Sequence, residues 1–411
     1  SVWEPVPGTN KYYLHSFHKD QPDLNWQNPV LREEIYTMIN WWLDKGIAGF
    51  RIDAIINIKK DLEWRSLPSD RANGLVPVPE SLVNAQPIEP FLQELKERTF
   101  AKYNAFTVGE VFNETDEELH FFIGKDGVFS SIFDFKQTML GQEGKGWFDH
   151  TLPTADELKE SIFQAHERAD SIGVLSTIIE NHDEPRGVSH YIAEGPVNDT
   201  SKKALGTIQV LRKGIPFIYQ GQEIGMENQV FESVEDFDDI ATINGYHVAK
   251  EAGLSEEEAL AAIAKYSRDN ARTPMQWTAE PGLGFSDGPA WLISPKPDYS
   301  INVEDQEKDP DSILNYYRQL TALYRHPLYG NTIRFGDMIP AYRDRENIIA
   351  FERRGDKRLL IVSNFQNRQA SLDLPAPIET VILNNVTGLF QEGDQVLELA
   401  PYQTIVLELA E

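Results

Sequence analysis

The chain has 411 residues, of which 41% are hydrophobic, so it can bury a large core and is too long for one ordinary domain. Its net charge of −27 argues against nucleic acids and anionic membranes as partners and favours a neutral substrate. Because there is no cysteine, disulfides, thiol catalysis and cysteine-bound metals are excluded. The sequence also contains no run of about 18 apolar residues, the length that would span a bilayer.

The first elements of the chain are a loop-like region and a helix. Residues 1–28 are polar, rich in proline and aromatic, and they contain the run Gln21-Pro22-Asp23-Leu24-Asn25. Asn28-Pro29 then predicts the start of a helix that ends at Gly46. We expect its apolar stripe to pack on a sheet, and the stripe consists of Leu31, Ile35, Met38, Ile39 and Trp42.

The next segment, Ile47 to Asp53, predicts a short buried strand with a carboxylate at its C-terminal end. Arg51 lies two positions before Asp53 and therefore points to the same face of the strand. Its guanidinium can orient the carboxylate and keep it ionised. A structural ion pair at the strand end is the alternative interpretation.

Two later segments repeat this arrangement. Residues 105–111 predict a strand that carries Glu110, and residues 174–183 predict another that ends in Glu180-Asn181-His182-Asp183. Helical patterns separate the three strands, as in successive β/α units of a parallel barrel. Barrel enzymes place their catalytic groups at the C-terminal ends of the strands, so we predict an active site there.

The remaining elements complete this organisation. A proline-rich connection at residues 67–90 predicts a rim loop, and helices are expected at 90–100, 115–124, 154–170, 201–213 and 310–326. Further barrel strands are expected at 128–135 and 215–223, which makes five in all. An acidic segment at 226–270 carries its own helix, with the Glu256–Glu258 run at its solvated start. Beyond residue 327, alternating strands at 348–351, 359–365, 381–383, 396–399 and 404–409 predict an all-β domain.

The ordered set of motifs resembles the alpha-amylase family, glycoside hydrolase family 13. The motifs are Gly49-Phe50-Arg51-Ile52-Asp53, Val108-Gly109-Glu110-Val111 and Glu180-Asn181-His182-Asp183. The run around Asp23 and the segment Arg268-Asp269-Asn270-Ala271-Arg272-Thr273-Pro274-Met275-Gln276-Trp277 are similar to those of the oligo-1,6-glucosidase and alpha-glucosidase branch. Each motif alone is weak, whereas the set is specific and extends over essentially the whole chain.

The resemblance implies an α/β fold, namely a (β/α)8 TIM barrel followed by an all-β C-terminal sandwich domain. This chain would contain the C-terminal five β/α units of the barrel. Residues 1–28 would be the tail of a subdomain inserted after the third barrel strand. Residues 29–328 would form barrel strands four to eight with the rim insertion at 226–270, and residues 329–411 the β domain.

The implied chemistry is retaining hydrolysis of a glycoside. Cleavage of an acetal develops oxocarbenium character, so Asp53 suits the nucleophile, and Glu110, whose pKa a neighbouring anion would raise, suits the acid and later the base. Asp183 is the third catalytic residue, and with His182 it would bind sugar hydroxyls. A metal site at His182 is disfavoured because no second histidine lies at ligand spacing.

Other residues are implied at the sugar site by resemblance. Arg272 would bind the sugar, with a structural arginine as the alternative. Tyr13, His15 and Phe17 would face the sugar cleft, or else pack a small subdomain core. Ala54 follows the nucleophile directly, and at this position the branch members that prefer alpha-1,6 bonds tend to have valine. The smaller residue favours alpha-1,4 bonds, with preferences shifted by about 1 to 3 kcal/mol.

We therefore expect an exo-acting alpha-glucosidase with a small oligosaccharide or disaccharide substrate, favouring maltose-type sugars, with isomaltose or sucrose possible. A transglycosylase or sucrose isomerase of the same family is one alternative. A non-catalytic relative that serves as a binding or transporter-associated protein is another, but such relatives degrade the acids that are intact here. We expect no cofactor in this chain and a cytoplasmic, bacterial location without nucleic-acid or membrane partners.

The family's motif with an aspartate, an asparagine and a histidine after the third strand does not occur in this sequence, nor does the calcium-like loop of some relatives. Five units would leave the barrel edges open, which is costly for parallel strands. We therefore expect a companion N-terminal segment of roughly 140 residues, an estimate from the barrel architecture, and any structural calcium site would lie in it.

Overall fold

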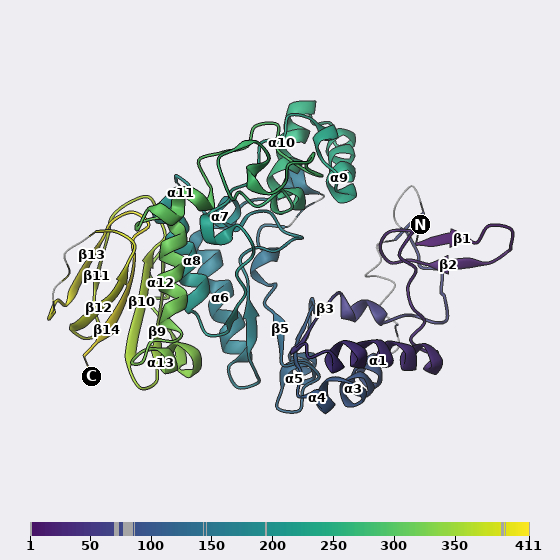
Figure 1. The fold of residues 1–411 in the computed structure, drawn as a ribbon, viewed down its shortest axis with the longest axis horizontal. Helices are drawn as coiled ribbons and strands as arrows, with labels where there is room; N and C mark the ends of the chain where they lie inside the picture. Colours follow the sequence, from purple (N-terminus) through teal and green to yellow (C-terminus); the bar gives the residue numbers. More distant parts are fainter. Residues whose placement is uncertain are drawn as a thin grey trace. The chain divides into compact units, whose positions relative to one another are not determined.

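The computed structural model describes residues 2–69, 74–76, 85, 87–142, 144, 146–193, 195–387, 390 and 392–410. It divides into two compact units (Figure 1). Unit 1 comprises Ser1–Phe133 and Ala169–Val174, and unit 2 comprises Asp134–Arg168 and Leu175–Glu411. Most of the predicted rim loop at 67–90 lies outside the described residues.

Unit 1 begins with an antiparallel hairpin of β1 (Trp3–Pro5) and β2 (Tyr12–Leu14). Three parallel strands follow in the order β3 (Gly49–Ile52), β4 (Phe106–Gly109) and β5 (Ser131–Phe133). In the sequence, β3 is preceded by α1 (Pro29–Asp44) and followed by the short helix η1 (Ile55–Ile58). Before β4 come α3 (Glu89–Arg98) and α4 (Phe100–Tyr103), and between β4 and β5 lies α5 (Asp116–Ile123). Gly49 is required where β3 meets β4, because a Cβ there would lie 1.7 Å from the carbonyl oxygen of Phe106.

Helix α1 corrects one expectation. The helix forms as predicted and starts at an Asn28 cap that accepts from the Val30 N–H, but it buries Tyr36, Ile39 and Leu43. Met38 and Trp42, both predicted in the stripe, are 50% and 44% exposed. The buried face is therefore rotated from the predicted stripe, and the exposed Trp42 ring packs edge-on against Trp41, which in turn lies under the Lys45 ammonium.

In unit 2, a pair of parallel strands, β6 (Leu175–Thr177) and β7 (Ile215–Pro216), alternates with helices. The helices α6 (Ala155–Ala169), α7 (Gly187–Tyr191), α8 (Asp199–Leu211) and α12 (Ile313–Leu323) supply most of its core. With β3 to β5, these are the five barrel strands that the sequence predicts. The strand expected to extend to residue 223 is only two residues long, because the chain turns at Gly221 into η4 (Gln222–Ile224).

The acidic segment after β7 forms two helices rather than the single one predicted. They are α9 (Ile240–Glu251) and α10 (Glu256–Tyr266), preceded by η5 (Val234–Asp236) and followed by η6 (Arg268–Ala271). The glutamate run starts α10 behind a Ser255 capping box, as expected of a solvated helix start. The turns η2 (Gln137–Met139), η3 (Trp147–Asp149) and η7 (Pro281–Gly284), together with α11 (Val303–Lys308), complete this part of unit 2.

The C-terminal part of unit 2 is an all-β domain introduced by α13 (Gly330–Phe335). Five antiparallel strands lie in the order β12 (Ile378–Asn384), β14 (Thr404–Leu409), β10 (Arg358–Asn364), β9 (Ile348–Arg354) and β8 (Asp337–Ala341), beside the pair β11 (Ala370–Asp373) and β13 (Val396–Leu399) (Figure 1). Alternate residues of β10 face two cores: Leu359 and Ile361 pack with α8 and α12, whereas Leu360 and Val362 pack with β11 and β13. The predicted sandwich therefore shares one face with the helices. In the described part of the chain, no helix is long and apolar enough to cross a membrane.

Candidate active site

Unit 1 brings two of the predicted acids together at the ends of neighbouring strands. Asp53 directly follows β3 and Glu110 directly follows β4, and the register pairs Ile52 with Gly109. The Arg51 guanidinium bridges them, since Nη1 donates to Asp53 Oδ1 and Nη2 lies 2.8 Å from Glu110 Oε1. The arginine predicted to orient Asp53 alone thus holds both carboxylates.

The two acids differ in their exposure to solvent. The Asp53 side chain is 71% exposed, whereas the Glu110 side chain is 7% exposed. Ala54 follows Asp53 with a left-handed backbone, φ 41°, which aims its N–H at Glu110 Oε2 over 2.7 Å. Both oxygens of Glu110 are therefore fixed, while Asp53 has an accessible carboxylate.

Burial raises the pKa of the Glu110 carboxyl, and the negative charge of Asp53 and a hydrogen bond with Asp53 raise it further. The Ala54 N–H and the Arg51 charge oppose this increase. A carboxyl whose pKa is raised retains its proton nearer to neutral pH, which is what a general acid requires.

Unit 2 holds the residues that follow β6. His182 Nε2 lies 3.0 Å from Asp183 Oδ2, and Arg272 Nη2 lies 2.8 Å from Asp183 Oδ1. Arg272 also donates from Nε to the His182 carbonyl at 2.8 Å, and the Asn181 side chain accepts from the Asp183 N–H at 2.7 Å. The structure thus joins three predicted sugar-binding residues in one cluster that can accept and donate hydrogen bonds to hydroxyls.

Glu180, the first residue of the same motif, has a different environment. Its carboxylate is fully buried, accepts from Arg186 Nη1 at 2.9 Å and from the Gly187 N–H at 2.6 Å, and so ties the segment to the start of α7. Two residues for which the sequence predicted no role also belong to the cluster, Arg268 and Asp239. Arg268 begins the motif that contains Arg272, four positions before it, and this position is the signal that could have suggested it.

Tyr13 and Phe17 lie on or beyond the β1–β2 hairpin of unit 1. The Tyr13 hydroxyl donates to the Lys19 carbonyl at 2.8 Å, its ring lies 6.0 Å from that of His15, and Phe17 is 57% exposed. These contacts fit the subdomain-packing alternative for Tyr13. A role of either residue at the sugar remains a prediction.

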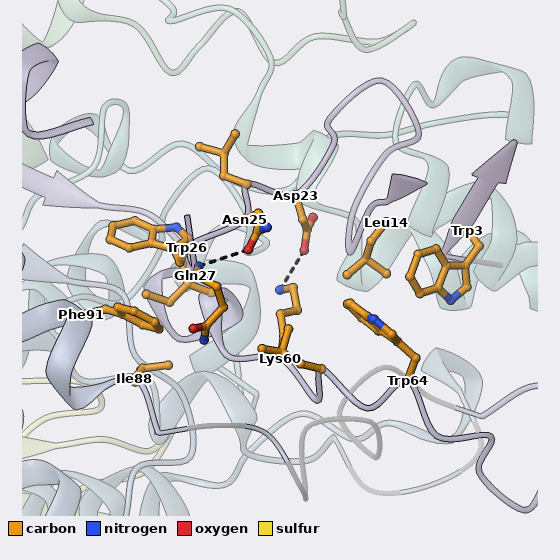
Figure 2. Close-up of a pocket in the computed structure, with 13 residues that line it drawn as sticks. Trp3, Leu14, Asp23, Asn25, Trp26, Gln27, Lys60, Trp64, Ile88 and Phe91 are labelled. Atoms are coloured by element: carbon orange, nitrogen blue, oxygen red, sulfur yellow. Dashed lines mark hydrogen bonds and ion pairs between the residues drawn. The ribbon is translucent and has the colours of Figure 1, made fainter. Parts of the chain in front are cut away.

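The motif around Asp23 forms one wall of a cavity of about 380 Å³ (Figure 2). Asp23 accepts from Lys60 Nζ at 2.9 Å and from the Ser16 hydroxyl and N–H at 2.6 and 2.9 Å. Burial opposes ionisation, but these hydrogen bonds hold the pKa of Asp23 below its usual value. Because Lys60 follows η1, the pair joins this motif to the segment after Asp53, and the cavity lies between Trp3, Trp64 and Phe91 without including the predicted acids.

Among the described residues, no group of three or more histidines and acids could hold a metal ion. The expectation that this chain needs no cofactor remains a prediction.

Comparisons with known proteins identify the family of this chain. Residues 1–328 match the alpha-amylase catalytic domain. The chain is 37% identical over 411 residues to the probable oligo-1,6-glucosidase 3 of Bacillus subtilis, covering 98% of this chain and 72% of that protein. It is 35% identical over 416 residues to the glucan 1,6-alpha-glucosidase of Streptococcus pneumoniae, covering 100% and 74%. The structure is similar to that of the isomaltulose synthase SmuA from Protaminobacter rubrum, with a TM-score of 0.91, 31% identity, and coverage of 100% of this chain and 74% of that one.

Fold and motif-bearing strands thus define a glycoside hydrolase built on the (β/α)8 barrel with a C-terminal β domain. The chain belongs to the alpha-amylase family, glycoside hydrolase family 13, and its relatives include oligo-1,6-glucosidases.

Proposed function

We propose that this enzyme is a retaining, exo-acting alpha-glucosidase that removes terminal alpha-linked glucose from short oligosaccharides or disaccharides. One observation carries the proposal: a single guanidinium, that of Arg51, bridges an exposed carboxylate and a buried carboxyl of raised pKa. These are the two states that double displacement requires of its acids.

In the first step, Asp53 attacks the anomeric carbon while Glu110 gives its proton to the leaving oxygen, so that the glycosidic bond breaks as the carboxylate–sugar bond forms. In the second step, the Glu110 carboxylate takes a proton from water, whose oxygen displaces Asp53 from the same anomeric carbon. Two inversions give net retention. Asp183, His182 and Arg272 would hold hydroxyls of the distorted ring.

We favour maltose-type substrates because Ala54 leaves more room beside the leaving group than a valine would. The names of the relatives favour alpha-1,6 bonds instead, since they include a glucan 1,6-alpha-glucosidase. Isomaltose and sucrose therefore remain the rival substrates. A neutral sugar also suits a chain whose net charge is −27.

The second candidate function is isomerisation or transglycosylation by the same covalent intermediate. The similarity to an isomaltulose synthase supports it. The two outcomes differ only in the acceptor for the glucosyl group, water or another sugar hydroxyl. A non-catalytic binding role is less well supported, because the three acids and His182 are all present.

The test substitutes each acid by its amide in the full chain. Asp53→Asn should lower kcat by about 10,000-fold or more, as loss of a nucleophile does. Glu110→Gln should lower it by about 100- to 10,000-fold on maltose, and less on a nitrophenyl alpha-glucoside, whose leaving group needs no proton. The matched controls are the exposed acids Asp20→Asn and Glu117→Gln, which should retain wild-type turnover.

Proton NMR of the first glucose released gives the stereochemistry. Alpha-glucose is expected, and beta-glucose would overturn the retaining mechanism. Formation of an isomeric disaccharide from sucrose, in place of free hexoses, would select the second candidate. Binding of sugars with no turnover of any alpha-glucoside by the wild-type chain would favour the binding protein.

A further inference from the structure

The Asp183 carboxylate has more side-chain partners than the residues of its own motif supply. Its Oδ1 accepts from two guanidinium groups, Arg272 Nη2 at 2.8 Å and Arg268 Nη1 at 3.0 Å, while its Oδ2 faces His182 Nε2 at 3.0 Å. A carboxylate on a flexible side chain can rotate about its last torsion. Two guanidinium groups on one oxygen and an imidazole nitrogen beside the other restrict that rotation and therefore the directions of the remaining lone pairs.

The two arginines are anchored differently. Arg272 uses its Nε on the carbonyl of His182, within the cluster itself. Arg268 uses its Nε and Nη2 on Asp239 Oδ1, each at 2.6 Å, and the Asp239 side chain is fully buried. Only the remaining nitrogen, Nη1, faces Asp183, so Arg268 is a bridge between a buried anion and the proposed sugar-binding acid.

The far end of this bridge is built into the helical insertion after β7. Asp239 caps α9, and its Oδ2 accepts from the Thr242 N–H and the Thr242 hydroxyl at 2.8 Å each. Its own N–H donates to Asp269 Oδ2 at 2.9 Å, and Asp269 is also fully buried. Burial opposes ionisation of Asp239, yet the hydrogen bonds from Thr242 and Arg268 hold its pKa below the usual value. Asp239 is thus a fixed negative charge.

We propose that Arg268 is a positioning residue for Asp183, and that it transfers the fixed position of Asp239 in the insertion to the carboxylate that holds the sugar. The proposal rests on the proposed function for the role of Asp183 as a sugar ligand. An error of about 1 Å in the placement of a group that acts in the transition state can lower the rate by about 100-fold. By this proposal, the insertion that contains α9 and α10 fixes the position of the Asp183 carboxylate.

A purely structural role makes a different prediction. If Arg268 only anchors the insertion, its loss should lower thermal stability and affect substrate binding and turnover alike. If it positions Asp183 for a strained transition state, its loss should lower kcat much more than it weakens the binding of ground-state glucose.

The experiment compares Arg268→Gln and Arg268→Lys with Arg318→Gln in the full chain. Arg318 is the matched control, because its guanidinium is exposed on α12 and pairs with Glu307 of α11, which is also exposed. We expect Arg268→Gln to lower kcat on the preferred alpha-glucoside by about 10- to 100-fold while the Kd for glucose changes by less than about threefold. Arg268→Lys should keep more activity, millimolar methylguanidine should partly restore Arg268→Gln, and Arg318→Gln should match the wild type.

Asp239→Asn tests the anchor separately. Because Arg268 would remain but lose its fixed partner, kcat should fall in the same direction, and the double variant should be little worse than Arg268→Gln alone. If the losses in kcat caused by Arg268→Gln and Asp239→Asn were fully additive, the two residues would not act as one bridge. An unchanged kcat in Arg268→Gln, or equal losses in kcat and glucose affinity with no rescue, would overturn the proposal.

A structural readout separates this proposal from the proposed function. If the wild-type chain hydrolyses no alpha-glucoside, the proposed function fails, but a crystal structure of Arg268→Gln still tests the positioning. We expect the Asp183 carboxylate to rotate away from His182 in that variant, with α9 unchanged. A carboxylate that keeps its orientation would overturn the inference.

Discussion

Arg51 is the residue on which the chemistry of unit 1 depends. Its guanidinium is shared between a solvent-exposed aspartate and a buried glutamate, so one cation contacts the two acids for which we propose opposite tasks. A lysine could not replace it, because a single ammonium lacks the planar pair of donors that faces both carboxylates at once. The two acids differ in exposure, 71% for Asp53 and 7% for Glu110, and burial raises the pKa of the Glu110 carboxyl.

Glu184, directly after Asp183, should make the stability of the fold depend on pH between about 4.5 and 8. Burial raises the pKa of its carboxyl to about 8, the charge of Asp183 contributes, and a hydrogen bond with Thr138 opposes the change. A carboxyl with a higher pKa in the folded state stabilises the fold fully below its unfolded pKa, near 4.5, and this contribution is lost as the pH rises through about 8.

We therefore expect Glu184→Gln to be more stable than the wild type at pH 8.5, by about 1 to 4 kcal/mol in the free energy of unfolding, and close to it at pH 4.5. Urea denaturation at the two pH values measures this difference. Glu117→Gln, an exposed acid, is the control. A Glu184→Gln effect that is independent of pH would contradict the prediction.

At the scale of elements, the turn between β3 and η1 depends on the backbone geometry of Ala54. Ala54 has φ 41° and directs its N–H to Glu110. A β-branched residue is disfavoured at positive φ, so the small side chain suits the turn. The proposed preference for alpha-1,4 bonds rests on the same side chain.

Ala54→Val should cost about 1 to 3 kcal/mol of stability through backbone strain. It should also raise the ratio of kcat/KM on isomaltose to that on maltose by about 10- to 200-fold, the range that one or two methyl groups give in a pocket. Steady-state kinetics on both sugars measure the ratio, with Ala101→Val in α4 as the control. A wild-type enzyme that already strongly prefers isomaltose would show that Ala54 does not set the linkage.

A second element-scale prediction concerns the β domain. Arg353 of β9 is fully buried, and its two Nη atoms donate to the carbonyls of Leu211, at the end of α8, and of Gly336, both at 2.9 Å. Burial lowers the pKa of Arg353 to about 10, still well above neutral. Its guanidinium therefore joins the sheet to the helical layer.

Arg353→Met should lower the free energy of unfolding by about 2 to 4 kcal/mol, because two buried carbonyls lose their partners. Its neighbour Arg354 provides the matched control, since its side chain is 50% exposed and its partner Glu352 keeps a second ion pair, with Arg358. Arg354→Met should cost about 0 to 1 kcal/mol. Urea denaturation measures both free energies of unfolding. Equal losses in the two variants would show that the buried hydrogen bonds of Arg353 add no stability beyond that of an exposed ion pair.

At the scale of the whole molecule, the net charge of −27 should limit stability at low ionic strength. Salt screens the repulsion among the acidic side chains, so raising NaCl from 10 mM to about 300 mM at pH 7.5 should raise Tm by about 1 to 4 °C. The increase should vanish near pH 4.7, the isoelectric point. Scanning calorimetry tests both expectations, and a Tm insensitive to salt at pH 7.5 would refute the first.

Local pattern explains why so much of the fold could be predicted. The five barrel strands, the helix behind Asn28-Pro29 and most of the C-terminal strands follow from periodicities of two and 3.6 residues, which a single segment displays on its own. Strands β8 and β11 were missed, because β8 contains Pro340 at an edge and β11 is only four residues long. The split of the insertion into α9 and α10 was missed for lack of a strong stripe.

The sequence by itself determined which residues stand at strand ends, because chemistry-bearing side chains there follow directly from chain order and from the direction of parallel strands. Only the tertiary structure decided which partners those side chains have. The sharing of Arg51 between two acids, the Ala54 N–H on Glu110 and the Arg268–Asp239 bridge all join segments distant in the chain or depend on one backbone angle. Such pairings are set by how distant segments pack, and a linear pattern carries no direct record of them.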